Sequence, residues 1–581
     1  MQSSILPSGG TTVYAYDSRC RVASISRGPS ASNLLERIDY TYDASTGQKN
    51  LEKMSAYESG AWVEKRRESY AYDSRGRLAL VTHADATSVA YTYDGANNIR
   101  SVRDERHTTP NTTYTYDPAG RLAAVTQTLS TAPGGHIVTA YGYDIHGNLT
   151  SVTDPNGNVT SYLYDDFGRM ISQTSPVTGT TSYSYDPAGN LITSTDARAV
   201  TTTRTYDVLN RVTAATAAGS TTEATNWSYD GSAPFARGRL ASMTDPSGST
   251  SYSYERRGAL LQEVRTIGSQ EYATMYQYDH DGNRSSISYP SGRIVNYTFD
   301  FADRPQTAAS DGSNLVSSAS YLPFGPLTQL VMGNGTTKAM TYDNRYRVRQ
   351  NTLTFASGLI ADYHYAEDAA GNITQIHDAV DSSFNRDFGY DDLNRLTTAT
   401  GGSSLWGTGG YTYDAMGNML TSTLGTTVQT FTYTGTTPKL ASVTYDAAGN
   451  ELSGPLSPVE TYTPRNLRDG FSYDGRGVRV LFTQAGFHGS PTVQTRVLYT
   501  PELRLLAAVS ADAEPGIVET WGNTRSREII WFGDLPVAQA DQSLPGEIIG
   551  LEEPPPPIVH YTFTVLITSV LRCFRPMRRE T

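Results

Sequence analysis

The sequence predicts an all-β protein, in which short hairpins form one long antiparallel sheet that must curl or close. A phrase rich in tyrosine recurs along the 581 residues, and no sustained i, i+3, i+4 apolar series typical of helices occurs. The composition agrees, because 40 Tyr and 51 Gly stand against only 15 Phe. Tyrosine suits half-buried strands and glycine suits turns.

The recurring phrase has the form Tyr-x-Tyr-Asp-x-x-Gly, followed by Arg or Asn and then an apolar residue. About twenty copies occur, and where the spacing is most regular the second Tyr falls at 143, 164, 185 and 206. We take the Tyr, Tyr, Asp and Gly of the phrase as a structural motif without a catalytic, cofactor or metal role. Five clear copies are Tyr70, Tyr72, Asp73 and Gly76; Tyr114, Tyr116, Asp117 and Gly120; Tyr141, Tyr143, Asp144 and Gly147; Tyr183, Tyr185, Asp186 and Gly189; and Tyr411, Tyr413, Asp414 and Gly417.

Each part of the phrase has a physical reason. Tyrosines at i and i+2 of a strand point to the same face, where cross-strand pairs contribute a few tenths to about 1 kcal/mol each. The Asp carboxylate caps a turn, and the Gly three residues later takes a positive φ. Asn210 and Asn394 replace that Gly, and Asn is the next-best residue for a left-handed turn. A unit of 21 residues therefore predicts one hairpin, which needs neighbours on both sides to be stable.

Charge and composition exclude several classes of protein. The net charge of −12 disfavours nucleic acid and anionic membranes as partners. Residues 1–10 lack the features of a signal peptide, and no apolar run is long enough for a membrane span. Cys20 and Cys573 do not make a disulfide framework. Cys20 occupies the Gly position of the phrase, so we interpret it as a replaced glycine and not as a reactive thiol.

Catalytic and metal-binding motifs are absent from the sequence. It holds no phosphate-binding loop, His-Glu-x-x-His, Gly-x-Ser-x-Gly or paired Cys ligands, so we expect no enzyme activity and no cofactor. His146 and His280 occupy variable turn positions. Residues 279–283 and 154–158 faintly resemble calcium loops but lack the full ligand series, which favours ordinary turns.

Two other features have a structural and a functional interpretation. The tyrosine rows either pack within the sheet or present rings that stack on sugars, and their repetition in every unit favours packing. The dispersed tryptophans do not decide between the two. Pro554 to Pro557 predict an extended linker more than a ligand for a proline-binding domain.

The repeated units resemble the YD repeats of the Rhs family, which includes the C subunits of insecticidal toxin complexes and the extracellular part of teneurins. The resemblance covers roughly residues 10 to 480. Residues 321–325, 499–506 and 531–539 also resemble family phrases, the last two from the segment that leads into the family's core. The resemblance implies a spiral β-sheet wound into a partial hollow shell. In full-length members the shell encloses a C-terminal toxin or effector until delivery.

The sequence suggests four segments. They are a disordered start (1–10), a repeat array (11–485), the last repeats before a missing core (486–550), and a Pro-rich linker with a non-native tail (551–581). The family's core and toxin are missing after residue 550. One compatible choice of codons for Leu566 to Glu580, read two bases later, gives His-His-Leu-Gly-Thr-Pro, close to the expected family phrase. We therefore hypothesise a frameshift there.

The leading functional hypothesis is a non-enzymatic bacterial scaffold that forms part of a toxin-enclosing shell, secreted or at the cell surface. Its expected partners are a toxin segment or components of a delivery system. The alternatives are a secreted or cell-surface adhesion protein that binds glycans, and a decayed gene fragment.

Overall fold

The computed structural model describes residues 2–7, 9–356, 358–454, 459–484, 492–513, 524–544 and 559–563. These residues form strands and turns, with two single-turn 3₁₀ helices, η1 (Pro133–Gly135) and η2 (Ser382–Phe384). The predicted all-β class is confirmed.

The strands belong to three antiparallel sheets, in which each strand pairs with the next along the chain. In the main sheet, which has 38 strands, the first 26 are β1 (Gln2–Ile5), β2 (Thr11–Tyr16), β3 (Val22–Gly28), β4 (Glu36–Tyr42), β5 (Lys49–Glu58), β6 (Ala61–Tyr72), β7 (Leu78–His83), β8 (Ser88–Tyr93), β9 (Ile99–Arg103), β10 (Thr112–Tyr116), β11 (Leu122–Thr128), β12 (His136–Tyr143), β13 (Leu149–Thr153), β14 (Val159–Tyr164), β15 (Met170–Ser175), β16 (Gly179–Tyr185), β17 (Leu191–Thr195), β18 (Thr201–Tyr206), β19 (Val212–Ala218), β20 (Thr222–Tyr229), β21 (Leu240–Asp245), β22 (Gly248–Tyr254), β23 (Leu260–Ile267), β24 (Gln270–Tyr278), β25 (Arg284–Ser288) and β26 (Ile294–Phe299). It continues with β27 (Pro305–Ser310), β28 (Ser313–Tyr321), β29 (Leu327–Met332), β30 (Thr337–Tyr342), β31 (Val348–Phe355), β32 (Gly358–Glu367), β33 (Ile373–Asp378), β34 (Arg386–Tyr390), β35 (Leu396–Gly401), β36 (Thr408–Tyr413), β37 (Met419–Leu424) and β38 (Thr427–Thr430). The second sheet holds β39 (Thr444–Tyr445) and β40 (Glu451–Ser453), and the third holds β41 (Ser472–Tyr473), β42 (Arg479–Gln484), β43 (Thr492–Tyr499), β44 (Leu505–Ala513), β45 (Thr524–Phe532), β46 (Leu535–Leu544) and β47 (Val559–Phe563).

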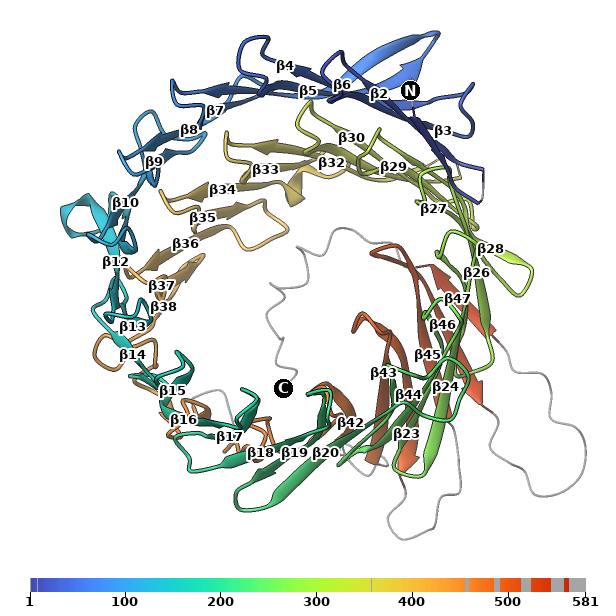
Figure 1. Cartoon of the computed structure of the whole chain (residues 1–581). Coiled ribbons are helices and arrows are strands. Elements are labelled where there is room, and N and C mark those ends of the chain that lie inside the picture. Colours follow the sequence, from blue (N-terminus) through green and yellow to red (C-terminus); the bar gives the residue numbers. More distant parts are fainter. Residues whose placement is uncertain are drawn as a thin grey trace, which may run out of the picture.

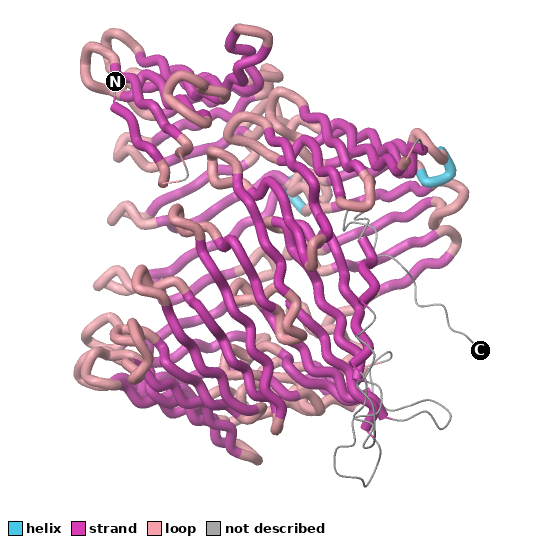
Figure 2. Tube along the Cα trace, turned by 90° about the vertical axis from the view of Figure 1, so that its right-hand side faces the viewer, coloured by secondary structure: helices cyan, strands magenta, loops and turns pink. Residues whose placement is uncertain are grey.

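The main sheet winds around an open centre as a spiral wall (Figure 1). We call residues 2–299 the first turn of the spiral and the residues from 300 onward the second turn. Chain segments separated by more than 200 residues meet where the second turn runs along the first; Glu36, for example, accepts a hydrogen bond from Arg304. Seen from the side, the strands cross the wall and the connecting turns line its two ends (Figure 2). The curled sheet is not closed.

Two sequence assignments need correction, and the prediction of one long sheet needs an addition. Residues 2–5 were expected to be disordered but form β1, which pairs with β2 from Gln2 opposite Tyr14 to Ile5 opposite Thr11. Backbone pairing along an edge needs no particular side chains, so composition does not reveal it. The predicted long sheet is confirmed for β1 to β38, and the later strands form two further sheets. Residues 559–563, assigned to a linker, pair with β46 as β47. The other residues of 551–581 lie outside the described part of the chain.

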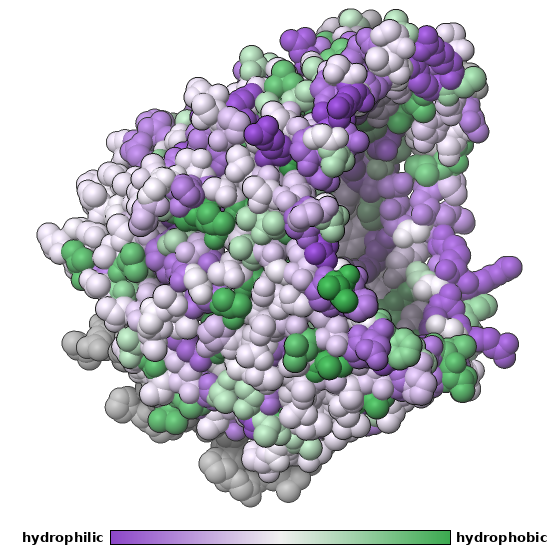
Figure 3. Space-filling view, turned by 60° about the vertical axis from the view of Figure 1, so that its left-hand side comes forward, coloured by the Kyte–Doolittle hydropathy of each residue, from purple (hydrophilic) through white to green (hydrophobic). Residues whose placement is uncertain are grey.

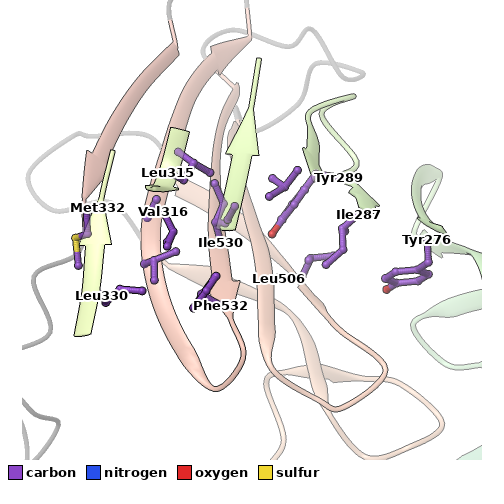
Figure 4. Close-up of a cluster of buried hydrophobic side chains, with 14 residues drawn as sticks. Tyr276, Ile287, Tyr289, Leu315, Val316, Leu330, Met332, Leu506, Ile530 and Phe532 are labelled. Carbon is purple, nitrogen blue, oxygen red and sulfur yellow. The ribbon is translucent and has the colours of Figure 1, made fainter. Parts of the chain in front are cut away.

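The main hydrophobic core lies where the seven-stranded sheet packs against the wall (Figure 4). The segment from β24 to β29 contributes Tyr289, in the turn after β25, and Val295 and Leu315 from its strands. From the other side, β44 to β46 contribute Leu506 and Ile530. In Figure 1 the seven-stranded sheet lies on the inner side of the wall. Here the structure is two sheets thick, as in a sandwich.

Ile530 provides a test of this two-layer packing. Its side chain is fully buried, so Ile530→Ala should destabilise the protein by about 2–5 kcal/mol and lower its urea midpoint. Ile171→Ala is the control, because Ile171 is exposed on the first turn and should cost much less. Equal effects of the two substitutions would contradict a buried interface between the sheets.

Candidate functional site

The motif aspartate organises each turn that joins two strands of a hairpin. We call the five residues from this Asp to the Arg or Asn four positions later the YD turn. In the turn 117–121, Oδ1 of Asp117 accepts hydrogen bonds from the backbone N–H groups of Ala119 and Arg121, both at 2.9 Å. Gly120 has a φ of 79° and no atom near the position of a Cβ. The capping and left-handed roles predicted from the sequence are both present.

The last residue of the YD turn links neighbouring repeats. Arg121 Nε donates to Asp117 Oδ2 at 2.7 Å, while its Nη1 donates to the carbonyl of Asp144 in the next YD turn, also at 2.7 Å. The guanidinium also lies 4.7 Å from the ring centre of Tyr143, a cation–π distance. This one side chain therefore contacts its own turn and the next one in three ways.

The hydroxyl of the second motif tyrosine makes the reverse link. It donates to a backbone carbonyl of the preceding repeat, as Tyr116 does to Ile99 at 2.8 Å and Tyr342 to Leu327 at 2.6 Å. Burial raises the pKa of Tyr342 to about 12, which keeps this phenol a neutral donor. These hydroxyls are used within the wall, which favours the packing interpretation of the tyrosine rows over sugar binding.

The five copies named from the sequence share this geometry. Their aspartates receive a side-chain hydrogen bond from Arg77, Arg121, Asn148, Asn190 and Asn418, respectively. Their glycines all have positive φ, from 78° to 96°. Their first tyrosines, Tyr70, Tyr114, Tyr141, Tyr183 and Tyr411, are half-buried. Second-tyrosine hydroxyl bonds to the preceding repeat are present at Tyr72, Tyr116, Tyr185 and Tyr413.

The other candidates behave as turn residues. Asp279 and Asp154 cap their loops in the same way as Asp117, with Oδ1 accepting two backbone N–H groups each. In the described part of the chain no cluster of three or more His, Cys, Asp or Glu could hold a metal ion. His146 occupies an exposed turn position. Among the same residues, no helix has the length and apolar character needed to cross a membrane.

A seam of polar contacts joins the two turns of the spiral, and the sequence did not predict it. On the first turn the seam uses what we call distal turns, which lie at the end of each hairpin opposite its YD turn. On the second turn it uses YD turns. The distal turn 154–158 meets the YD turn 414–418, where Asn156 Nδ2 donates to Asp414 Oδ2 at 2.7 Å.

Arginines and carboxylates dominate this seam. Arg345, in a YD turn of the second turn, lies 3.0 Å from Glu105 and 3.5 Å from Asp85 on the first turn. Buried Glu36 accepts from Arg304 at 3.1 Å and from the Phe324 N–H at 2.9 Å. Other contacts of this kind across the seam are Arg106–Asp368, Arg465–Glu223, Asp392–Ser130 and Asp245–Gly475.

Several seam contacts come from the second and third residues of the YD turn, which we call tip positions, while others use its first or last residue, as at Asp414 and Arg304. Asp392, Arg345 and Gly475 are tip residues of the second turn. The sequence carries no signal for these contacts, because charged tip residues such as Arg75 and Arg257 also occur on the first turn, where they bond neighbouring repeats.

We predict that the YD turns make the protein sensitive to acid. The backbone N–H of Arg121, and then its side chain, lower the pKa of Asp117 below its usual value. For Asp73 and Asp186, the largest cause of the lowered pKa is the hydrogen bond from the side chain of Arg77 and of Asn190, respectively. Protonation of these carboxylates therefore favours the unfolded chain. Their contribution is complete above pH about 4 and is lost as the pH falls through the lower folded values.

Thermal unfolding between pH 7 and pH 2.5 measures this effect. As the pH falls below about 4, the melting temperature of the wild type should decrease. The melting temperature of the triple variant Asp73→Asn/Asp117→Asn/Asp186→Asn should decrease less. Asp166→Asn, at an exposed tip position, should follow the wild type. An acid profile unchanged in the triple variant would contradict the role of the turns.

Cys20 tests the left-handed position. It is exposed, has a φ of 61° and occupies the place of the motif glycine. Because a non-glycine residue is strained there, Cys20→Gly should stabilise the protein by about 0.5–1 kcal/mol in urea unfolding. Gly120→Cys, made where a Cβ meets nothing within 4 Å, should change stability in the opposite direction. Two neutral substitutions would disprove the argument from strain.

Comparisons with known proteins agree with this geometry. Residues 72–109, 93–136, 127–159, 143–180, 164–201 and 185–222 each match the RHS repeat family. No curated protein matches the sequence significantly.

Solved structures share the fold at low identity. The crystal structure of TcdB2-TccC3-TEV is 17% identical with a TM-score of 0.79, over 96% of this chain and 33% of that one. The Photorhabdus luminescens Tc holotoxin pore is 17% identical with a TM-score of 0.70, over 93% and 31%. This chain thus spans about a third of the length of the structures it matches. Residues 72–222 therefore carry RHS repeats, and the described chain shares the spiral-sheet fold of these structures.

Proposed function

We propose that this chain forms part of the wall of a shell that encloses a toxin or effector, and that enclosure, without catalysis, is its activity. The observation that carries the proposal is the hollow spiral wall, whose repeats are joined to one another within each turn and across the seam (Figure 1). The likeness to structures of toxin complexes, which extends across about a third of their length, supports the same role.

The construction of the wall suits a container. A space-filling view shows a hollow beside a surface on which apolar side chains form separate spots (Figure 3). The polar seam connects consecutive turns edge to edge, so a chain in the hollow has to pass an end of the spiral or break seam contacts. A segment held there is separated from large solutes such as proteases.

The partners follow from this role. We propose a toxin or effector segment as the cargo and components of a delivery system as the outer partners, with action outside the producing cell. Glycan adhesion and a decayed fragment are the alternatives. The internal use of the tyrosine hydroxyls, such as that of Tyr116, favours the container over the adhesion protein.

Protection of an unfolded reporter tests enclosure. A Gly/Ser-rich segment with one protease site, fused after residue 581, should be cut roughly ten-fold more slowly than the same segment free in solution. Cleavage at the rate of the free segment would contradict enclosure.

Two charge reversals separate enclosure from a simple effect of fusion. Arg345→Glu places a carboxylate against Asp85 and Glu105 in the seam and should restore most of the cleavage rate. Arg67→Glu is the matched control, because exposed Arg67 pairs only with nearby Glu64 among the described ion pairs. It should leave the protection intact, and equal loss in both variants would argue against the seam as the barrier.

A further inference from the structure

The YD turns of the first turn of the spiral lie along its free edge, and several of them carry strongly exposed apolar residues at the tip positions. Ile145 is 95% exposed, Phe167 83% and Val208 98%, with Leu209 beside Val208. They occupy the YD turns 144–148, 165–169 and 207–211, with the turn 186–190 between the last two. Exposed apolar groups in a row are typical of interaction surfaces. We call this row the YD rim.

The same tip positions already form an interface elsewhere in the molecule. On the second turn, tip residues such as Arg345 and Asp392 contact the distal turns of the first turn. On the YD rim, the hydrogen bonds of the turns 144–148 and 165–169 in the described structure are confined to their own and neighbouring repeats. The YD rim is thus a seam edge without the opposing wall.

A matching edge lies at the other end of the spiral. The distal turns of the second turn carry exposed Phe355, Val380 and Val428, 48%, 50% and 62% exposed. They lie at or beside the turns after β31, β33 and β37, and the turn after β35 separates the last two. We call this row the distal rim. Along the chain, each rim therefore has two repeats with an exposed apolar residue, then one repeat without, and then a further repeat with one.

The spacing of the two rims is also matched. Each repeat contributes two strands, so neighbouring turns on either rim lie about 10 Å apart. The internal seam shows that a distal edge and a YD edge with this spacing fit together in the same direction, since the turns 154–158 and 196–200 meet 414–418 and then 463–467. The rims differ from the seam in using apolar side chains in place of ion pairs.

We propose that the YD rim of one copy docks onto the distal rim of a second copy of this chain, so that copies associate head to tail and continue the spiral. Such a contact uses two different surfaces of the protein and leaves one rim of each kind free at the ends of the assembly. This association goes beyond the proposed enclosure and does not depend on a cargo. Because each copy carries a net charge of −12, added salt should strengthen the apolar contact.

Sedimentation velocity on paired rim variants tests this directly. The wild-type chain should show masses that rise above 63.2 kDa as its concentration increases, up to roughly 100 μM. A YD-rim variant, Phe167→Asp/Val208→Asp, and a distal-rim variant, Val380→Asp/Val428→Asp, should each remain monomeric. Their mixture should form a dimer but nothing larger, because each variant retains the rim that the other lacks.

Met275→Asp is the control, because Met275 is apolar and about as exposed as Val380 of the distal rim but lies in the middle of β24. It should associate like the wild type. A monomeric wild type at all concentrations, a mixture that forms no dimer, or association that survives both rim variants would each overturn the proposal.

Discussion

The structure depends on the carboxylate of the motif aspartate and the cation or amide that it holds. Asp117 fixes the turn through two backbone N–H groups, and its second oxygen orients Arg121 toward the next repeat. Charge-assisted hydrogen bonds of this kind are strong and directional. Repeated along one edge, they set the distance between hairpins where few side chains are fully buried. The wall is therefore joined along its turns as well as by backbone pairing between strands.

The spiral follows from this repetition together with the seam. Consecutive edges carry turns at the same two-strand spacing, so groups on one edge meet partners on the other repeatedly. Arg345 and Arg304 of the second turn face the acidic Glu105 and Glu36 of the first. Single exposed pairs of this type contribute little, but several partly buried pairs in register can select one alignment of the edges.

The local part of this architecture was predictable and the distant part was not. The turn capping, the positive φ of Gly120 and of Asn210, and the place of Cys20 as a replaced glycine depend on five neighbouring residues, which the sequence shows together. The seam between Asn156 and Asp414 joins residues 258 apart, and the sheet that buries Ile530 packs on a segment more than 200 residues earlier. No local pattern identifies such partners. The first strand was missed for another reason, because edge pairing uses the backbone alone.

Most of the wall is one sheet thick, and this bears on the enclosure proposed for it. A globular protein gains its stability mainly from a shared hydrophobic interior. A wall that depended on such an interior would need an object in the hollow to complete it. Here the main core lies where β44 to β46 cover β24 to β29, while elsewhere the turn ladder and the tyrosine hydroxyl bonds act along the wall itself. Those contacts are made without any group in the hollow. A wall stabilised in this way keeps its shape independently of its contents, so it places few demands on the sequence of an enclosed segment.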